Sequence, residues 1–216
     1  MSRQTLAAEL RAVLDPLSDE VLKATPQASD YDLNPSIRPD QTRPLRPAAV
    51  LVPVIWREPG ATVLLTRRAD TLNSHTGQVA FPGGRIEPGE TVVEAALREA
   101  HEEVGLDPAK IHPLGLSDVY ETGTGFCVTP VVAVVDTPFE LTLNPDEVAA
   151  AFETPWDFLM DTGNYRKESM VWNGAERWFW AMRWDDIGTE RYIWGATAGM
   201  IRRLQQRMAR LSGGGG

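Results

Sequence analysis

A cluster of acidic side chains between residues 91 and 104 is the part of the sequence best suited to chemistry. Thr91–Val104 has helical periodicity and opens with the capping-box pattern Thr91-x-x-Glu94. At about 100° per residue, Glu99, Glu102 and Glu103 lie on one side of this helix, and an apolar stripe lies on the other. Like charges at this spacing destabilise a helix by about 0.2–0.5 kcal/mol per pair. Because carboxylate oxygens suit hard cations, the cluster predicts a site for Mg²⁺ or Mn²⁺.

The residues around the cluster decide between this interpretation and a merely solvated, charged helix face. Arg98 lies one turn before Glu102, where its guanidinium can orient a carboxylate. Nine positions have a fixed spacing, which by chance would occur about once in 10⁹ sequences or more rarely. They read Gly84-x5-Glu90-x7-Arg98-Glu99-Ala100-x-Glu102-Glu103-x-Gly105-Leu106. This stretch resembles the signature box of the Nudix hydrolases.

The resemblance implies a fold, a reaction and a set of ligands. The expected fold class is α/β, a Nudix-type α/β/α sandwich with a mixed sheet. The expected reaction is metal-dependent hydrolysis of a nucleoside diphosphate linked to another moiety. Metal would be held by Glu99, Glu102 and Glu103, with the carbonyl of Gly83 as a further ligand, and Arg98 would be a catalytic residue that orients them. Such metals screen the phosphate charge and acidify the attacking water.

A second motif lies directly upstream and narrows the substrate. The sequence reads Leu64-Leu65-Thr66-x-Arg68-Ala69, then Asn73, Gly77 and Phe81-Pro82-Gly83-Gly84. It is similar to the signature of the coenzyme A pyrophosphatase branch of the Nudix family, and it departs at Asn73, where that signature has an Arg. A guanidinium and an amide are not interchangeable in phosphate binding.

The resemblance to this branch implies candidate substrate contacts. Arg68 is a candidate contact for a substrate phosphate, because it supplies local positive charge in an acidic protein. Asn73, Gly77 and Arg85 complete the expected substrate-binding set, with a plain surface role as the alternative for Arg85. Glu147 lies outside the box, where related enzymes often recruit a glutamate, so it is a catalytic candidate beside Glu102 for the general base.

Composition limits the other classes of function. Lys plus Arg total 21 and Asp plus Glu total 30, giving a formal net charge of −9. Proteins that bind nucleic acid generally need excess positive charge, so we expect no nucleic-acid partner. Cys127 is the single cysteine, which excludes an intrachain disulfide. With no apolar run near the roughly 20 residues of a membrane span, we expect a cytoplasmic protein without a membrane partner.

The elements that position these residues can be anticipated from pattern. We expect three regions. The first is an N-terminal helix and Pro-rich loop (residues 1–47), which packs on the second, a hydrolase domain (48–211). The third is a flexible Gly tail (212–216). The N-terminal helix is centred on Leu6–Leu17. Strands are predicted at Ala48–Trp56, Ala61–Thr66, Gln78–Phe81, Leu116–Glu121, Cys127–Val135 and Arg177–Arg183, and further helices at Pro155–Leu159 and Ala196–Leu211. Trp178, Trp180 and Trp184 are expected to fill the core or the interface of a homodimer.

The sequence therefore predicts cleavage of CoA, acyl-CoA or oxidised CoA into adenosine 3′,5′-bisphosphate and 4′-phosphopantetheine or its derivative. Two alternatives stay open. One is a Nudix pyrophosphatase for ADP-ribose, NADH or dinucleoside polyphosphates. The other is a Nudix-fold module that binds a nucleotide without hydrolysing it, which usually lacks some of the carboxylates of the box.

Overall fold

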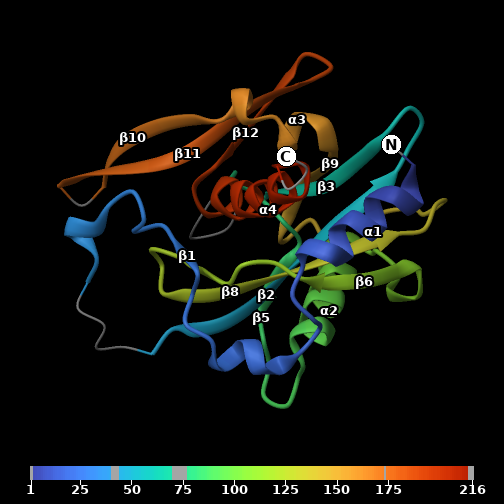
Figure 1. Cartoon of the computed structure of the whole chain (residues 1–216), viewed down its shortest axis with the longest axis horizontal. Helices are drawn as coiled ribbons and strands as arrows, with labels where there is room; N and C mark the ends of the chain where they lie inside the picture. Colours follow the sequence, from blue (N-terminus) through green and yellow to red (C-terminus); the bar gives the residue numbers. More distant parts are fainter. Residues whose placement is uncertain (1, 40–43, 70–76, 173, 214–216) are drawn as a thin grey trace.

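A large mixed sheet forms the centre of the molecule in the computed structural model, which describes residues 2–39, 44–69, 77–172 and 174–213 (Figure 1). Its strands run in the order β1-β7-β8-β2-β3-β4, with β5 paired to β2, β6 to β8 and β9 to β3. The bounds are β1 Ala28–Ser29, β2 Arg46–Trp56, β3 Ala61–Arg68, β4 Val79–Ala80, β5 Gly83–Arg85, β6 Ile111–Leu116, β7 Tyr120–Glu121, β8 Phe126–Val135 and β9 Val148–Pro155. The β1–β7 and β2–β8 pairs are parallel and the others antiparallel, so the sheet is mixed as predicted.

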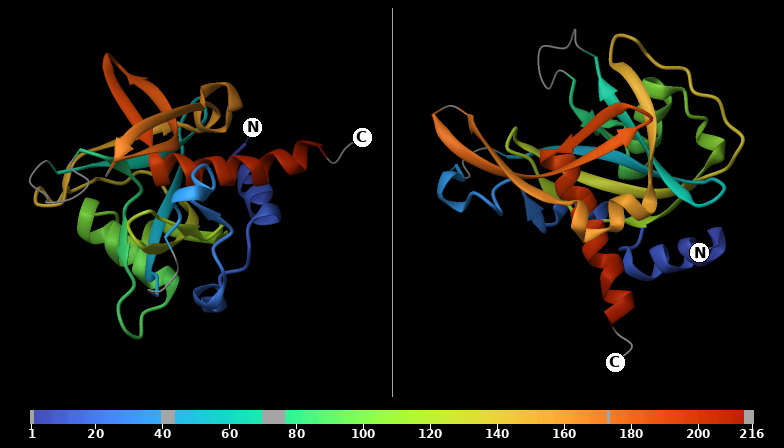
Figure 2. Two further views of the ribbon diagram at one scale, coloured as in Figure 1. Left: turned by 90° about the vertical axis from the view of Figure 1, so that its left-hand side faces the viewer. Right: turned by 90° about the horizontal axis from the view of Figure 1, so that it is seen from above.

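Helices cover both faces of this sheet (Figures 1 and 2). α2 (Val92–Val104) lies on one face, where its buried residues form one core cluster with alternate residues of β2, β3 and β8. The other face packs against α1 (Arg3–Val13) and α4 (Gly195–Gly213), which contribute to a second core cluster. This is the α/β/α sandwich with an N-terminal helix that the sequence predicts. Two apolar faces on each central strand explain why β2 and β8 are almost continuously apolar.

A second, three-stranded antiparallel sheet lies beside α4 and has the strand order β10-β11-β12 (Figure 1). Its strands are β10 Arg166–Trp172, β11 Ala175–Asp186 and β12 Thr189–Trp194. The short helix α3 (Trp156–Met160) precedes it, and single 3₁₀ turns occur at Asp19–Lys23, Pro35–Ile37, Pro108–Lys110 and Thr162–Asn164. No helix among the described residues is long and apolar enough to cross a membrane.

The prediction of one strand over Leu116–Glu121 is wrong. The chain leaves β6 at Leu116 and pairs again only at β7, Tyr120–Glu121. The interruption contains Asp118, whose buried carboxylate accepts hydrogen bonds from Arg203 and Arg207 of α4 at 2.5 and 2.6 Å. A buried carboxylate needs such partners, and this contact with α4 replaces continued strand pairing.

Candidate active site

Two glycines allow the loop before α2 to pass very close to its neighbours. A Cβ at Gly84 would lie 2.4 Å from a carboxylate oxygen of Glu99, and one at Gly83 would lie 2.5 Å from the carbonyl oxygen of Ala49. A Cβ at Gly83 would clash with backbone atoms, whereas one at Gly84 would force the Glu99 carboxylate to shift. The loop therefore brings its backbone against the acidic side of α2, and β5 holds it there through its pairing with β2.

Helix α2 begins and ends with strong local signals. The side chain of Thr91 accepts a hydrogen bond from the Glu94 N–H at 3.1 Å, and the Glu94 carboxylate accepts one from the Thr91 N–H at 2.9 Å. This is the predicted capping box. Gly105 ends the helix with φ of 69°, in the left-handed region that favours glycine. These two ends fix which residues of α2 face the loop.

Arg98 is the hub of the acidic side. Its Nε donates to Glu90 Oε1 at 2.7 Å, and its Nη1 donates to Glu99 Oε1 at 3.0 Å and to Glu102 Oε2 at 2.9 Å. Its Nη2 reaches the carbonyl oxygen of Arg85 at 3.1 Å. The hydrogen bond from Arg98 holds the pKa of Glu90 below its ordinary value. Arg98 thus joins helix and loop and orients several carboxylates.

Glu103 is the most deeply placed carboxylate of the helix. Only 3% of the residue is exposed, and its Oε2 accepts a hydrogen bond from the Gly83 N–H at 3.3 Å. Burial raises the pKa of Glu103 to about 8, while the positive charge of Arg68 acts in the opposite direction. The charge of Arg68 only partly offsets the cost of burying the Glu103 carboxylate, which is the state expected of a group that binds a cation.

Glu99 and Glu102 differ in exposure. The side chain of Glu99 is 15% exposed, whereas that of Glu102 is 52% exposed. Burial raises the pKa of Glu99, and the negative charges of Glu102 and Glu147 add to that rise against the effect of Arg98. Glu99 is therefore shielded from solvent, and Glu102 is open to it.

Glu147 reaches this cluster from the turn before β9. The N–H of Asn144 donates to the Glu103 carbonyl at 2.9 Å, which ties the turn to α2. The side-chain amide of Asn144 donates to Glu147 Oε1 at 3.1 Å. The charge of Glu147 raises the pKa of both Glu99 and Glu103, so its carboxylate faces the site. Asn144 is not among the site residues predicted from the sequence, although an Asn followed by Pro is a turn signal that indicates such local hydrogen bonding.

The donor set fits a divalent cation, although the carboxylates do not already converge on one point. Within the described parts of the chain, no three Asp, Glu, His or Cys side chains are arranged as a ready metal-ligand group. Glu99 and Glu102 are instead drawn to Arg98. Buried, mutually repelling carboxylates beside a glycine cradle are nevertheless oxygen ligands of the kind that Mg²⁺ and Mn²⁺ prefer. A bound cation would relieve the burial cost of Glu103.

The predicted substrate residues are only partly gathered at this site. Arg68 ends β3, and its charge acts on Glu103; its Nε is buried without a hydrogen-bond partner among the described residues. Gly77 has φ of 69° and leads into β4, and Asn73, four residues before it, lies outside the described residues. Arg85 is exposed, with its guanidinium carbon 5.6 Å from the centre of the Phe126 ring.

The Gly84→Ala substitution is expected to lower kcat about tenfold or more and to leave the melting temperature nearly unchanged. The added methyl group would displace the Glu99 carboxylate by about 1 Å, and misplacement of this size costs up to about 10²-fold in rate. Steady-state hydrolysis and thermal unfolding measure the two effects. A matched control is Gly60→Ala, because a Cβ at Gly60 meets no atom within 4 Å and Gly60 is not among the glycines with positive φ. A Gly84→Ala rate equal to that of wild type would contradict the placement of Glu99.

A glycine loop against an acidic helix, with an arginine that orients the carboxylates, defines a metal-assisted hydrolase of phosphoanhydride bonds. The NUDIX domain family matches residues 45–172 of this chain. The chain therefore belongs to the Nudix family, and it is a Nudix pyrophosphohydrolase. Members of this family generally use a divalent metal such as Mg²⁺ or Mn²⁺.

Relatives of known sequence support the assignment over most of the chain. The "Uncharacterized Nudix hydrolase NudL" of Cronobacter sakazakii is 41% identical over 173 residues, which cover 78% of this chain and 87% of that protein. The protein of the same name from Klebsiella pneumoniae is 36% identical over 192 residues, covering 87% and 96%. Among solved structures, the Nudix hydrolase RenU of M. smegmatis is 27% identical with a TM-score of 0.46, covering 54% of this chain and 74% of that one.

Proposed function

We propose that this enzyme hydrolyses the pyrophosphate bond of coenzyme A and its derivatives, acyl-CoA and oxidised CoA. The products are adenosine 3′,5′-bisphosphate and 4′-phosphopantetheine or its derivative. The observation that carries the proposal is the upstream motif, which runs along β3 and through β4 into the loop at Gly83 and Gly84. Arg68, the arginine of that motif, acts electrostatically on Glu103. A phosphate held by Arg68 would therefore lie beside the acidic cluster.

Different residues of the chain hold the metal, orient its ligands and bind the substrate in this reaction. Arg98 orients Glu99 and Glu102, while Glu103 and the Gly83 carbonyl complete the set that would hold Mg²⁺ or Mn²⁺. When bound, the divalent cation neutralises phosphate charge and lowers the pKa of the attacking water. Arg68 binds the phosphate, and Asn73, Gly77 and Arg85 are assigned to the substrate on the motif.

Two glutamates are candidates for the general base, Glu102 and Glu147. Glu102 is exposed and bound to Arg98, and Glu147 lies near enough to Glu99 and Glu103 for its charge to raise the pKa of both. The pH dependence of kcat/KM in Glu102→Gln and Glu147→Gln identifies the base as the residue whose loss removes the acid limb of the profile, a change that loss of a metal ligand alone does not cause.

The second candidate function is pyrophosphatase activity on ADP-ribose, NADH or dinucleoside polyphosphates. Asn73 favours it, because the motif of the CoA branch has an arginine there. Competition between equal concentrations of CoA and ADP-ribose separates the two. Our proposal requires that CoA be consumed first, and prior loss of ADP-ribose would support the second function instead. A third function, nucleotide binding without hydrolysis, requires that neither be consumed.

Asn73→Arg is expected to lower KM for CoA about tenfold with little change in kcat. The substitution restores the guanidinium of the motif, and a charged, bidentate donor binds phosphate more strongly than an amide does. Initial rates over a range of CoA concentrations measure the effect. Asn73→Lys is the matched control, since it adds the charge without the planar fork. Equal KM values for all three proteins would exclude Asn73 from substrate binding.

We also propose a cytoplasmic location, consistent with a single cysteine, and association into a homodimer. Light scattering at working concentration tests the homodimer, and a mass of one chain would exclude it.

A further inference from the structure

A cavity of about 510 Å³ lies on the α4 side of the large sheet, away from α2. It is enclosed by the N-terminal segment 28–37, by β4 and the end of β7, by β11 and by the first turns of α4. Its volume is typical of sites for small molecules. Much of this wall lies outside residues 45–172, the part that matches the family domain. The cavity is therefore built largely from segments added to that domain.

The cavity wall is mainly aromatic and apolar. Trp172, Trp178, Phe179, Trp180, Trp194 and Tyr31 are the aromatic residues that line it. Phe179 and Trp194 contact each other with ring centres 5.1 Å apart. Trp172 and Trp178 are 53% and 36% exposed, which places them where the cavity opens. Trp180 packs against the core as predicted, whereas Trp178 lies on the cavity wall and is not part of the core.

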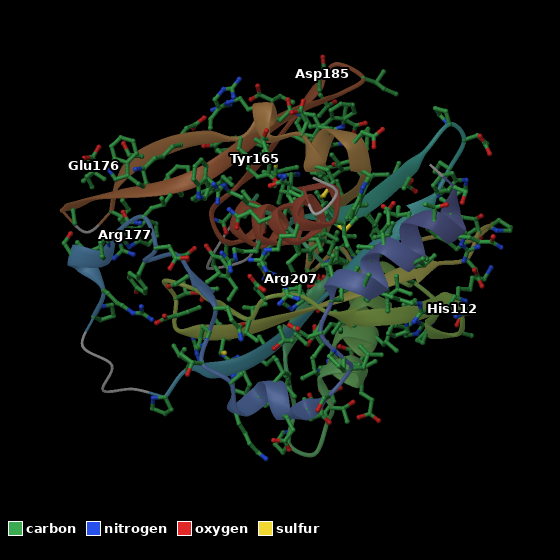
Figure 3. The ribbon with its side chains drawn as sticks, viewed as in Figure 1. His112, Tyr165, Glu176, Arg177, Asp185 and Arg207 are labelled. Carbon is green, nitrogen blue, oxygen red and sulfur yellow. The ribbon has the colours of Figure 1, made fainter. Side chains whose placement is uncertain are left out.

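Most polar groups of the wall are already hydrogen-bonded within the protein. The carboxylate of Asp30 accepts from the Tyr120 hydroxyl at 3.0 Å and from the Gly123 N–H at 2.7 Å. Asn34 donates to the carbonyl of Trp178 and accepts from its N–H, both at 2.7 Å. These bonds fix the N-terminal segment against β11, beside the labelled Arg177 (Figure 3).

Further polar groups are engaged in the same way. Thr197 donates to the carbonyl of Val79 at 3.0 Å, Arg203 is bound to Asp118, and Arg202 stacks over the Trp180 ring at 4.2 Å. A purine base buried here would leave its own donors and acceptors poorly satisfied, at a cost of about 1–3 kcal/mol per group. An apolar ligand brings no donors or acceptors that need such partners, although it leaves unpaired the Nε of Arg177, which is buried without a hydrogen-bond partner among the described residues.

The cavity lies close to the candidate active site. Val79 and Ala80 of β4 line it, and Gly83 follows Ala80 by three residues. Three residues of extended chain span at most about 10 Å. The pantetheine arm of CoA, with its two amide bonds, is comparable in length to such a segment. A second link lies at the end of β3, where the Arg68 N–H donates to the carbonyl of Gln78 at 2.9 Å; Gln78 lines the cavity, and the charge of Arg68 acts on Glu103.

We propose that this cavity binds the apolar acyl group of an acyl-CoA, and so makes a medium-chain thioester a better substrate than free CoA. This inference rests on the proposed function, since it places the half of that substrate that leaves as acyl-phosphopantetheine. It adds a specificity site formed by the N-terminal segment and β11, outside the acidic cluster.

Two measurements on Trp172→Ala and Trp178→Ala test this inference, with Val171→Ala as the control because Val171 is 77% exposed and outside the cavity wall. The first is the ratio of kcat/KM for decanoyl-CoA to that for CoA. We expect both Trp variants to lower this ratio about tenfold, through a higher KM for decanoyl-CoA. Their rates on free CoA should equal those of wild type, and Val171→Ala should keep the wild-type ratio. The second is calorimetric binding of the two products, decanoyl-phosphopantetheine and adenosine 3′,5′-bisphosphate, which needs no turnover.

The binding data separate this inference from the proposed function. If no CoA derivative is hydrolysed but decanoyl-phosphopantetheine binds in a manner that depends on Trp172, the proposed function fails and the acyl site stands. If the Trp variants weaken only adenosine 3′,5′-bisphosphate, the cavity is a nucleotide site and the inference is overturned. Unchanged ratios and unchanged binding in both Trp variants would also overturn it.

Discussion

Glu103→Gln is expected to lower kcat about 10²- to 10³-fold without unfolding the protein. It removes a negatively charged ligand of the divalent cation that would stabilise the reacting phosphate. Glu103 is 3% exposed, and its burial raises its pKa to about 8. The amide of Gln has nearly the same shape, and its oxygen can still accept from the Gly83 N–H. Because the raised pKa means that burial of this carboxyl costs stability at neutral pH, a cost that the amide of Gln does not carry, the melting temperature in the absence of metal should equal or exceed that of wild type.

Steady-state rates with Mg²⁺ and thermal unfolding with and without Mg²⁺ measure these effects. Mg²⁺ that binds only the folded protein raises the melting temperature of wild type, and Glu103→Gln should show a smaller rise. Glu87→Gln is the control, because Glu87 is exposed and lies between Gly84 and Glu90 without entering the cluster. A Glu103→Gln protein with the rate and the Mg²⁺ response of wild type would remove Glu103 from the metal site.

Arg98→Ala is expected to have the largest effect on stability, about 2–3 kcal/mol, together with a loss of about 10- to 100-fold in rate. The guanidinium binds Glu90, Glu99 and Glu102 and the carbonyl of Arg85. Its removal leaves these carboxylates without their counter-charge. Urea unfolding gives the change in the free energy of unfolding, and the same preparation gives the rate.

Arg98→Lys distinguishes charge from geometry. A Lys keeps the charge but cannot make the forked contacts of Arg98, so we expect it to recover part of the stability and little of the rate. Arg183→Ala serves as the surface control, since Arg183 pairs with Glu190 where both side chains are more than half exposed. If Arg98→Ala cost no more than this control, Arg98 would be an ordinary surface residue.

The elements that carry local signals could be predicted from the sequence. The capping box at Thr91 and the glycine at Gly105 fixed both ends of α2, because their effects operate within one turn. The core strands β2 and β8 were predicted within two residues, because runs of apolar, β-branched residues are typical of buried strands. The same locality made the acidic side of α2 predictable.

The parts that depend on distant contacts could not be predicted. β6 was missed, and Leu116–Glu121 was predicted as one strand because the pairing of Asp118 with α4 has no local signature. β9, β10 and β12 were also not predicted. Their buried and exposed residues do not alternate regularly, so the two-residue period of a strand is not visible in the sequence. The cavity forms only where the N-terminal segment and β11 meet, and these segments are far apart in the sequence. Trp178 and Trp180, considered alone, therefore predicted only apolar packing.

The most direct test of the account is a substrate panel with Mg²⁺ or Mn²⁺, in which mass spectrometry identifies the products formed from CoA, a short acyl-CoA, CoA disulfide, ADP-ribose, NADH and diadenosine polyphosphates. We expect the CoA compounds to yield adenosine 3′,5′-bisphosphate and 4′-phosphopantetheine or its derivative. We also expect these products to form faster than the products of ADP-ribose, NADH and the diadenosine polyphosphates. Faster cleavage of ADP-ribose or a dinucleotide, with CoA barely consumed, would contradict the proposed substrate and leave only the Nudix assignment.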